Sequence, residues 1–221
     1  AEDGIRDIGV TGVQTCALPI CSFQLYLAPA MVDRLMAAQA PPELGGEERE
    51  ITVLFSDVAG FTALSEGLTP HELVQVMNTY LSAMTDIVEE KGGFVDKYIG
   101  DAIMALFPRS ASDAVSAAVA MQREVATVHV VLPSVQRHPA ETELSADALS
   151  MRSLAIGVGI HKGSTMLGTV GEKGRFEATV ISDAVNLAAR LEQATVTLGV
   201  RVLISGEVAA DLDDEIGRAH V

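Results

Sequence analysis

Short apolar runs bounded by turn residues mark the strands in the first half of the chain. Residues 51–55 (ITVLF), 94–99 (FVDKYI) and 102–107 (AIMALF) are rich in β-branched, aromatic or other apolar side chains. Runs of this length and composition are typical of buried strands. The Gly100-Asp101 pair between the last two runs indicates a tight hairpin turn. We therefore expect a buried hairpin with a carboxylate at its tip.

Stretches with the helical spacing of apolar residues alternate with these strands. Residues 71–93 follow a Thr-Pro pair, which is a helix-start signal, and end at two glycines, so they predict a long helix. A second helix is expected over 112–128 and a third from about 183 to 193. The amphipathic stretch 22–39 predicts a further short helix near the N-terminus, and the Pro-, Gly- and Glu-rich residues 41–50 predict a linker.

The second half of the chain has weaker signals. Residues 154–160 and 165–171 predict two more strands joined by a turn at the intervening sequence HKGS. Residues 172–178 (EKGRFEA) are expected to form a loop, and 129–150 a long exposed loop. A strand at 200–204 and a short closing helix complete the pattern.

The predicted order is β-α-β-β-α-β with additions. This order is typical of an α+β fold, a ferredoxin-like sandwich with its helices packed on one face of a sheet. Its length is sufficient for one domain with an ample hydrophobic core.

Composition narrows the class of function. The chain has 30 Asp and Glu against 15 Lys and Arg, for a formal net charge of −15, so it is a poor candidate for binding nucleic acid. No apolar run reaches the roughly 18 residues of a membrane span. We expect a cytoplasmic domain, with a membrane anchor in a missing N-terminal region left open.

The two ends look foreign to the rest of the chain. Residues 1–20 (AEDGIRDIGVTGVQTCALPI) and 216–221 (IGRAHV) resemble the translation of a common short-read sequencing adapter and its reverse complement. We expect both segments to be artefacts and exclude them from fold reasoning. Cys16 lies within the adapter-like segment and Cys21 at its junction, so neither a disulfide nor a cysteine metal site is expected.

Two aspartates come at the ends of predicted buried strands: Asp57 after the strand at 51–55, and Asp101 at the hairpin tip. Each also has a purely structural interpretation: Asp57 as the cap of a following helix, and Asp101 as a turn residue. Together, carboxylates on neighbouring strands suit Mg²⁺, which binds through one or two carboxylates plus substrate phosphates. The following turn, VAGFT, supplies backbone N–H groups suited to phosphate oxygens.

A third element, TVISDAVNLAARLE (179–192), carries Asn186 and Arg190 four residues apart, hence on one side of a helix. A solvated helix face explains the pair equally well. The functional alternative is that the arginine binds a phosphate through two N–H donors and the asparagine orients a sugar.

The segments FSDVAGFT, DKYIGDAIMALF and TVISDAVNLAARLE resemble the three signature segments of the class III nucleotidyl cyclase catalytic domain, in the family's order. The resemblance covers residues 47–214, and LYLAPAMVDRLMA within 22–46 resembles the lead-in helix and linker of bacterial members. It implies a catalytic domain that is truncated at its C-terminal end, together with an upstream sensory domain in the uncut protein.

The resemblance also assigns roles to individual residues. It implies that Asp57 and Asp101, with the Val58 carbonyl, hold two Mg²⁺ or Mn²⁺ ions per active site. The triphosphate is then received by the turn of Gly60, Phe61 and Thr62. The chain ends before the phosphate-binding lysine often found in the family's last strands, and we expect Arg175 or Lys173 to substitute for it in part. Lys97 and Thr179 stand at the purine-reading positions, and Asn186 and Arg190 at the positions that orient the ribose and stabilise the transition state. In the family's head-to-tail homodimer, each site is shared between chains.

The purine can also be argued from hydrogen bonding. Lysine only donates, whereas threonine donates or accepts, so Lys97 and Thr179 together suit the N1 acceptor and amino group of adenine. Adenylyl cyclase acting on ATP, with release of pyrophosphate, is therefore the leading hypothesis. The alternatives are a guanylyl cyclase and a catalytically inactive nucleotide-sensing or dimerisation module.

Overall fold

The computed structural model describes residues 45–133, 149–172 and 175–212 of the 221-residue chain. The two adapter-like segments, the predicted lead-in helix and most of the predicted loop at 129–150 lie outside the described residues. Within the described ranges, no helix combines the length and the apolar character that crossing a bilayer requires.

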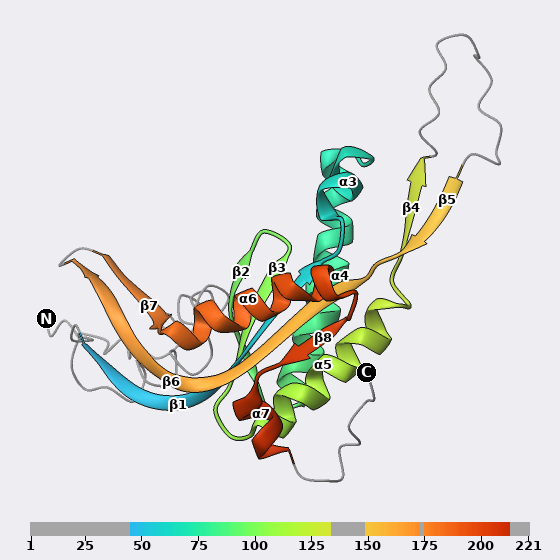
Figure 1. Ribbon diagram of the computed structural model, residues 1–221. Coiled ribbons are helices and arrows are strands. Elements are labelled where there is room, and N and C mark those ends of the chain that lie inside the picture. The colour runs from blue at the N-terminus through green and yellow to red at the C-terminus, as the bar shows by residue number, and fades with distance from the viewer. Residues whose placement is uncertain (1–44, 134–148, 173–174, 213–221) are drawn as a thin grey trace, which may run out of the picture. The chain divides into compact units, whose positions relative to one another are not determined.

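Six strands form the main sheet, in the order β2-β3-β1-β6-β7, with β8 beside β6 (Figure 1). Every pairing is antiparallel except β6 with β8. The bounds are β1 Gly45–Val58, β2 Phe94–Ile99, β3 Ala102–Phe107, β6 Ile156–Glu172, β7 Arg175–Ile181 and β8 Val202–Ile204. The order β1-α4-β2-β3-α5-β6 is the predicted β-α-β-β-α-β, so the α+β, ferredoxin-like fold class is confirmed. A separate pair, β4 (His129–Pro133) and β5 (Leu149–Ser153), completes the strands described.

The described helices are α3 Phe61–Glu66, α4 Pro70–Glu90, α5 Ala111–Val125, α6 Asp183–Leu198 and α7 Gly206–Asp211. α4 begins as predicted, because Thr69 forms a capping box with Glu72 of the first turn and Pro70 is the first residue of the helix. Ser182 caps the start of α6, because its hydroxyl accepts from the Val185 amide, and Gly199 in the left-handed region caps the end.

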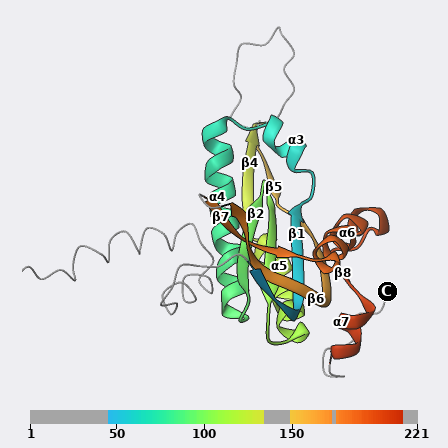
Figure 2. The ribbon, with the colours of Figure 1, turned by 90° about the vertical axis from the view of Figure 1, so that its left-hand side faces the viewer.

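Helices cover both faces of the main sheet, and Figure 2 shows α4 and α6 on opposite sides of the strands. One core joins the sheet to α4, α5 and α7, and includes Leu54, Tyr80, Ile103, Ala117, Val158 and Val208. The other core joins the opposite face to α6, and includes Val53, Phe55, Met104, Ala184 and Ala188. The prediction of helices on one face therefore holds for α4 and α5 and is wrong for α6, which belongs to the addition after the sixth element.

β6 is one unbroken strand, which corrects the predicted turn at 161–164. Its backbone pairs with β1 straight through that segment, with Thr52 opposite Lys162 and Ile51 opposite Gly163. β1 in turn begins at Gly45, inside the predicted linker. The long antiparallel partner outweighs the local turn preference of Lys-Gly-Ser, because each residue that stays extended gains cross-strand hydrogen bonds.

Two further loop predictions are corrected. Residues 175–178 of the expected EKGRFEA loop belong to β7, which pairs with the far end of β6. The expected loop at 129–150 starts and ends in paired strands, with His129 opposite Ser153 and Pro133 opposite Leu149.

Two glycines of β6 allow α6 to lie directly on the sheet. A Cβ atom at Gly159 would lie 2.2 Å from the backbone nitrogen of Glu192 and 2.3 Å from the carbonyl oxygen of Ala188. A Cβ atom at Gly157 would lie 2.5 Å from Thr195 Oγ1 and 2.7 Å from Glu192 Oε1. These separations are below any real Cβ contact, so a side chain at either position would displace its neighbours on α6.

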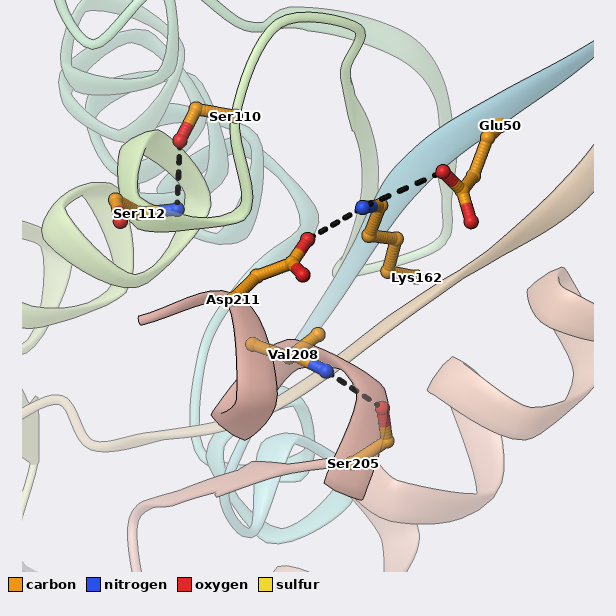
Figure 3. Close-up of polar contacts among 7 residues, drawn as sticks. All are labelled: Glu50, Ser110, Ser112, Lys162, Ser205, Val208 and Asp211. Atoms are coloured by element: carbon orange, nitrogen blue, oxygen red, sulfur yellow. Dashed lines mark hydrogen bonds and ion pairs between the residues drawn. The ribbon is translucent and has the colours of Figure 1, made fainter. Parts of the chain in front are cut away.

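β6 also anchors α7, the last of the described helices (Figure 3). Lys162 Nζ forms an ion pair with Asp211 at the end of α7 and a second, at 3.3 Å, with Glu50 of β1. The Ser205 hydroxyl caps α7 by accepting from the Val208 amide at 3.4 Å. These contacts fix α7 against the β1–β6 pair.

Candidate active site

Asp57 and Asp101 lie together at one end of the sheet. Asp57 is the penultimate residue of β1, and Asp101 follows Gly100 in the turn between β2 and β3. Gly100 has a φ of +66°, and Ile99 pairs with Ala102, so the predicted two-residue hairpin is confirmed. Because β1 and β3 are adjacent, the strand ends bring both carboxylates to the same place.

Both carboxylates converge on one backbone amide. The Val58 N–H donates to Asp57 Oδ1 at 3.0 Å and to Asp101 Oδ2 at 3.3 Å. Burial, the contact with the Asp101 carboxyl and the negative charges of Asp101 and Glu192 raise the pKa of Asp57 to about 7, while the Val58 amide opposes the shift. Full ionisation of the pair is therefore disfavoured while no cation lies beside it.

This arrangement fits a hard divalent cation. Two convergent carboxylates provide the oxygen ligands that Mg²⁺ and Mn²⁺ prefer, and a cation would relieve the repulsion that raises the pKa of Asp57. Among the described residues, no set of three His, Cys, Asp or Glu side chains has the geometry of a metal site. Any ion held by the pair therefore needs further ligands from backbone, water or substrate phosphates.

The segment after Asp57 forms a short helix where the sequence predicted only a turn. Gly60, at φ +73°, precedes α3, and the amide of Leu64 returns to the Gly60 carbonyl at 3.1 Å. Phe61 and Thr62 lie in the first turn, whose amides have no acceptor within a helix. The expected phosphate-binding role of Gly60, Phe61 and Thr62 thus remains a prediction, now placed on backbone N–H groups directly beyond Asp57.

Lys97 lies on β2, close to where that strand becomes irregular. The pairing of β2 with β3 shifts between Val95 and Lys97, which indicates a bulge at Asp96. Lys97 Nζ lies 3.5 Å from Asp96 Oδ2, so its ammonium has a carboxylate neighbour on its own strand. The purine-reading role of Lys97 stays a prediction.

Thr179 and Arg175 are both on β7. The backbone of Thr179 pairs with Gly168 and that of Arg175 with Glu172, on the far part of β6. Thr179 is therefore on a regular strand, and Arg175 begins that strand instead of lying in the expected loop. The roles predicted for both residues stay predictions.

Asn186 and Arg190 project away from their own sheet. The buried line of α6 is Ala184, Ala188, Glu192 and Thr195. Arg190 follows Ala188 by two residues, which at 3.6 residues per turn is about 200° around the helix. Asn186 and Arg190 are accordingly both exposed, and among the described contacts none joins either to Asp57 or Asp101.

The sequence interpretation missed one candidate. Glu192 is only 8% exposed although it is a carboxylate, and it lies on the α6 face that packs on β6. Its charge acts on Asp57. The spacing of Ala184, Ala188 and Glu192, four residues apart each time, was the signal that could have placed it on the buried face.

Comparison with known proteins shows the family of the domain. Residues 46–219 match the family model described as the adenylate and guanylate cyclase catalytic domain. The chain is 39% identical over 165 residues to an adenylate cyclase of Anabaena cylindrica, covering 74% of this chain and 31% of that protein. It is 35% identical over 188 residues to the terminal-differentiation specific adenylate cyclase of Dictyostelium discoideum, covering 83% of this chain and 8% of that protein. The chain thus spans about a third or less of these two relatives.

Solved structures of both cyclase types are similar to this chain. The adenylyl cyclase CyaB from P. aeruginosa aligns with a TM-score of 0.60 at 32% identity, over 77% of this chain and 84% of that one. The guanylyl cyclase Cya2 aligns with a TM-score of 0.64 at 31% identity, over 80% and 85%. The fold and the family match therefore define a nucleotidyl cyclase catalytic domain. The chain belongs to the adenylate and guanylate cyclase catalytic domain family, and the resemblance of its three motifs is confirmed.

Proposed function

We propose that this domain is an adenylyl cyclase that converts ATP into 3′,5′-cyclic AMP and pyrophosphate. The observation that carries the proposal is the convergence of Asp57 and Asp101 on the Val58 amide, beside the backbone N–H groups that open α3. In the reaction, the ribose 3′-oxygen bonds to the α-phosphorus and the bond from that phosphorus to the β-phosphate oxygen breaks. The 3′-hydroxyl proton passes to solvent.

Asp57 and Asp101 would hold two Mg²⁺ or Mn²⁺ ions, with Val58 supplying its carbonyl. Bound metal would neutralise the triphosphate and lower the charge that builds up at the transferred phosphorus. The protein's own contribution is positioning: the carboxylates and the α3 amides would fix the phosphates, so that the 3′-oxygen meets the α-phosphorus in line. Asn186 would orient the ribose, and Arg190 would stabilise charge in the transition state.

A shared homodimer site explains the direction of the α6 side chains. Asn186 and Arg190 lie about 200° from the buried line of their helix, so they point away from the Asp57–Asp101 pair of their own chain. A second copy, related by a twofold axis, would meet them with its own aspartates. Each dimer would then contain two equivalent sites.

Lys97 and Thr179 support ATP over GTP. An ammonium donates to the adenine N1 but cannot accept from the guanine N1–H, and the threonine hydroxyl accepts from the adenine amino group. Overall sequence identity does not decide between adenine and guanine, because the adenylyl cyclase CyaB and the guanylyl cyclase Cya2 are almost equally similar to this chain, at 32% and 31% identity. A guanylyl cyclase is therefore the alternative enzyme. Replacing Lys97 by Glu and Thr179 by Cys should shift the substrate preference of the domain from ATP toward GTP.

The remaining proposals concern the whole protein. We infer that residues 47–214 are the catalytic unit and that 22–46 lead into it from an upstream sensory domain. The chain spans only 31% and 8% of the two relatives, and the remaining length of each relative is sufficient for such a domain. Signal transduction in the cytoplasm, where the domain would meet ATP, is part of the same proposal.

The test is a turnover assay with one nucleotide at a time. The purified protein is incubated with ATP or GTP in the presence of Mg²⁺ or Mn²⁺, and cyclic AMP, cyclic GMP and pyrophosphate are quantified. We expect cyclic AMP and pyrophosphate in equal amounts, with GTP a poor substrate. Preferential cyclisation of GTP would assign the chain to the guanylyl cyclases. Binding of ATP without any cyclic product would favour the inactive nucleotide-sensing module.

A further inference from the structure

Glu192 is a buried carboxylate in a line of small residues. It follows Ala184 and Ala188 on the face of α6 that packs on the sheet, and the residue is 8% exposed. Burying a carboxylate without a partner costs free energy, so such a residue is unexpected where alanine or leucine would also fit.

No donor in the described part of the chain satisfies this carboxylate. The Thr195 hydroxyl donates to the Glu192 backbone carbonyl at 2.6 Å and leaves the side chain free. The structure gives the Glu192 side chain neither an ion pair nor a hydrogen bond with any described residue. Space for it is provided by Gly157, where a Cβ would lie only 2.7 Å from Glu192 Oε1.

Strand register places this carboxylate beside Asp57. Gly157 of β6 is the direct partner of Asp57 of β1. Side chains alternate along a strand, so Asp57 points to the same face as Val53 and Phe55, which is the face that α6 covers. The proximity has an electrostatic consequence, because the charge of Glu192 contributes to raising the pKa of Asp57. The pKa of Glu192 itself is raised by burial and then by the charge of Asp101.

We propose that Glu192 is a positioning carboxylate for the divalent cation held by Asp57 and Asp101. It acts from the outer sphere, by accepting a hydrogen bond from a water molecule bound to the ion. We assign it to the outer sphere and not to direct coordination, because the described residues contain no three acidic groups in ligand geometry. The inference deepens the proposed function and rests on its metal assignment. Outer-sphere partners of this kind orient bound groups and strengthen metal binding.

The test compares Glu192→Gln with the wild-type chain in nucleotide-free Mn²⁺ binding, measured by titration calorimetry and by the electron paramagnetic resonance signal of free Mn²⁺. Glutamine keeps the shape of the side chain and removes its charge. We expect the Kd for Mn²⁺ to rise about tenfold, the lower end of the effect of losing an outer-sphere partner. Glu89→Gln, at an exposed position on α4, removes the same charge away from the site and should leave the Kd unchanged.

Thermal melting in a chelator separates this role from packing. Without metal, Glu192→Gln should melt at or above the wild-type temperature, because repulsion with the aspartates is relieved. Glu192→Leu should likewise melt at or above the wild-type temperature without metal, and it should bind Mn²⁺ more weakly than the wild-type chain. A wild-type Kd in Glu192→Gln overturns the proposal, and so does a lower metal-free melting temperature, which would assign Glu192 to packing. If the wild-type chain itself binds no Mn²⁺, the metal assignment of the proposed function fails instead.

Discussion

Replacing Gly159 by alanine should displace α6 from the sheet and destabilise the domain. The added Cβ would lie 2.2 Å from the Glu192 nitrogen and 2.3 Å from the Ala188 oxygen, whereas real Cβ contacts essentially never fall below 3.0 Å. Both obstructing atoms belong to the helix backbone, so no side-chain rotation relieves the clash. α6 must therefore move by nearly an ångström.

The cost can be estimated from overpacking in other protein cores. Inserted methyl groups that force backbone shifts cost about 1–3 kcal/mol, and a clash with two backbone atoms belongs at the upper end. For a domain of this size, 1 kcal/mol lowers Tm by roughly 2–4 °C, so about 3 kcal/mol corresponds to roughly 6–12 °C.

The assay is thermal unfolding followed by circular dichroism, without metal or nucleotide. Gly206→Ala is the matched control, because nothing lies within 4 Å of a Cβ at that position on α7. It should leave Tm unchanged or raise it slightly, since alanine favours helix over glycine. A Gly159→Ala chain that melts within a degree or two of wild type would refute the close packing of α6 on β6.

Four further predictions concern the site. Asp57→Ala or Asp101→Ala should abolish cyclic AMP formation with either Mg²⁺ or Mn²⁺, and near-normal turnover from either variant would contradict the metal assignment. Arg190→Ala should lower turnover by roughly two to three orders of magnitude, as for loss of one preorganised contact to the transition state. Mixing Arg190→Ala with Asp101→Ala should restore about a quarter of wild-type activity, because half of randomly paired dimers hold one intact site; no recovery despite chain exchange would exclude a shared site. Finally, the folded-state pKa of Asp57, about 7, lies above its ordinary value of 3.8, so the folded state binds this proton more tightly. The stability of the metal-free domain should therefore fall as pH rises from about 4 to about 7, and Asp57→Asn should make this fall smaller. A Tm measured in chelator that rises over this pH range would contradict the raised pKa of Asp57.

The parts of the fold that local chemistry determines could be predicted from the sequence. The Gly100-Asp101 hairpin needs only a glycine at positive φ between two apolar runs, and α4 needs only its Thr-Pro start and apolar spacing. The convergence of Asp57 and Asp101 followed because Asp57 lies at the end of β1 and Asp101 directly precedes β3, the strand adjacent to β1.

Features that depend on distant partners could not be predicted in this way. The extended conformation of 161–164 is imposed by β1, which lies about a hundred residues earlier in the chain. Likewise, the face of the sheet that α6 covers depends on the space left by Gly157 and Gly159, which a one-dimensional pattern does not reveal. Glu192 was overlooked for the same reason, because a glutamate on an amphipathic helix is usually solvated.

The pairing of β1 with β6 has a consequence for folding of the nascent chain on the ribosome. β3 can cover one edge of β1 soon after synthesis, but the other edge waits for β6, whose residue Ile156 pairs with Val58. Pairings this distant in sequence close slowly. At roughly 5–20 residues per second, the ribosome needs roughly 5–20 s to deliver that partner. During this interval we expect β1 to present an open row of backbone donors and acceptors, which favours edge-to-edge association of incomplete chains.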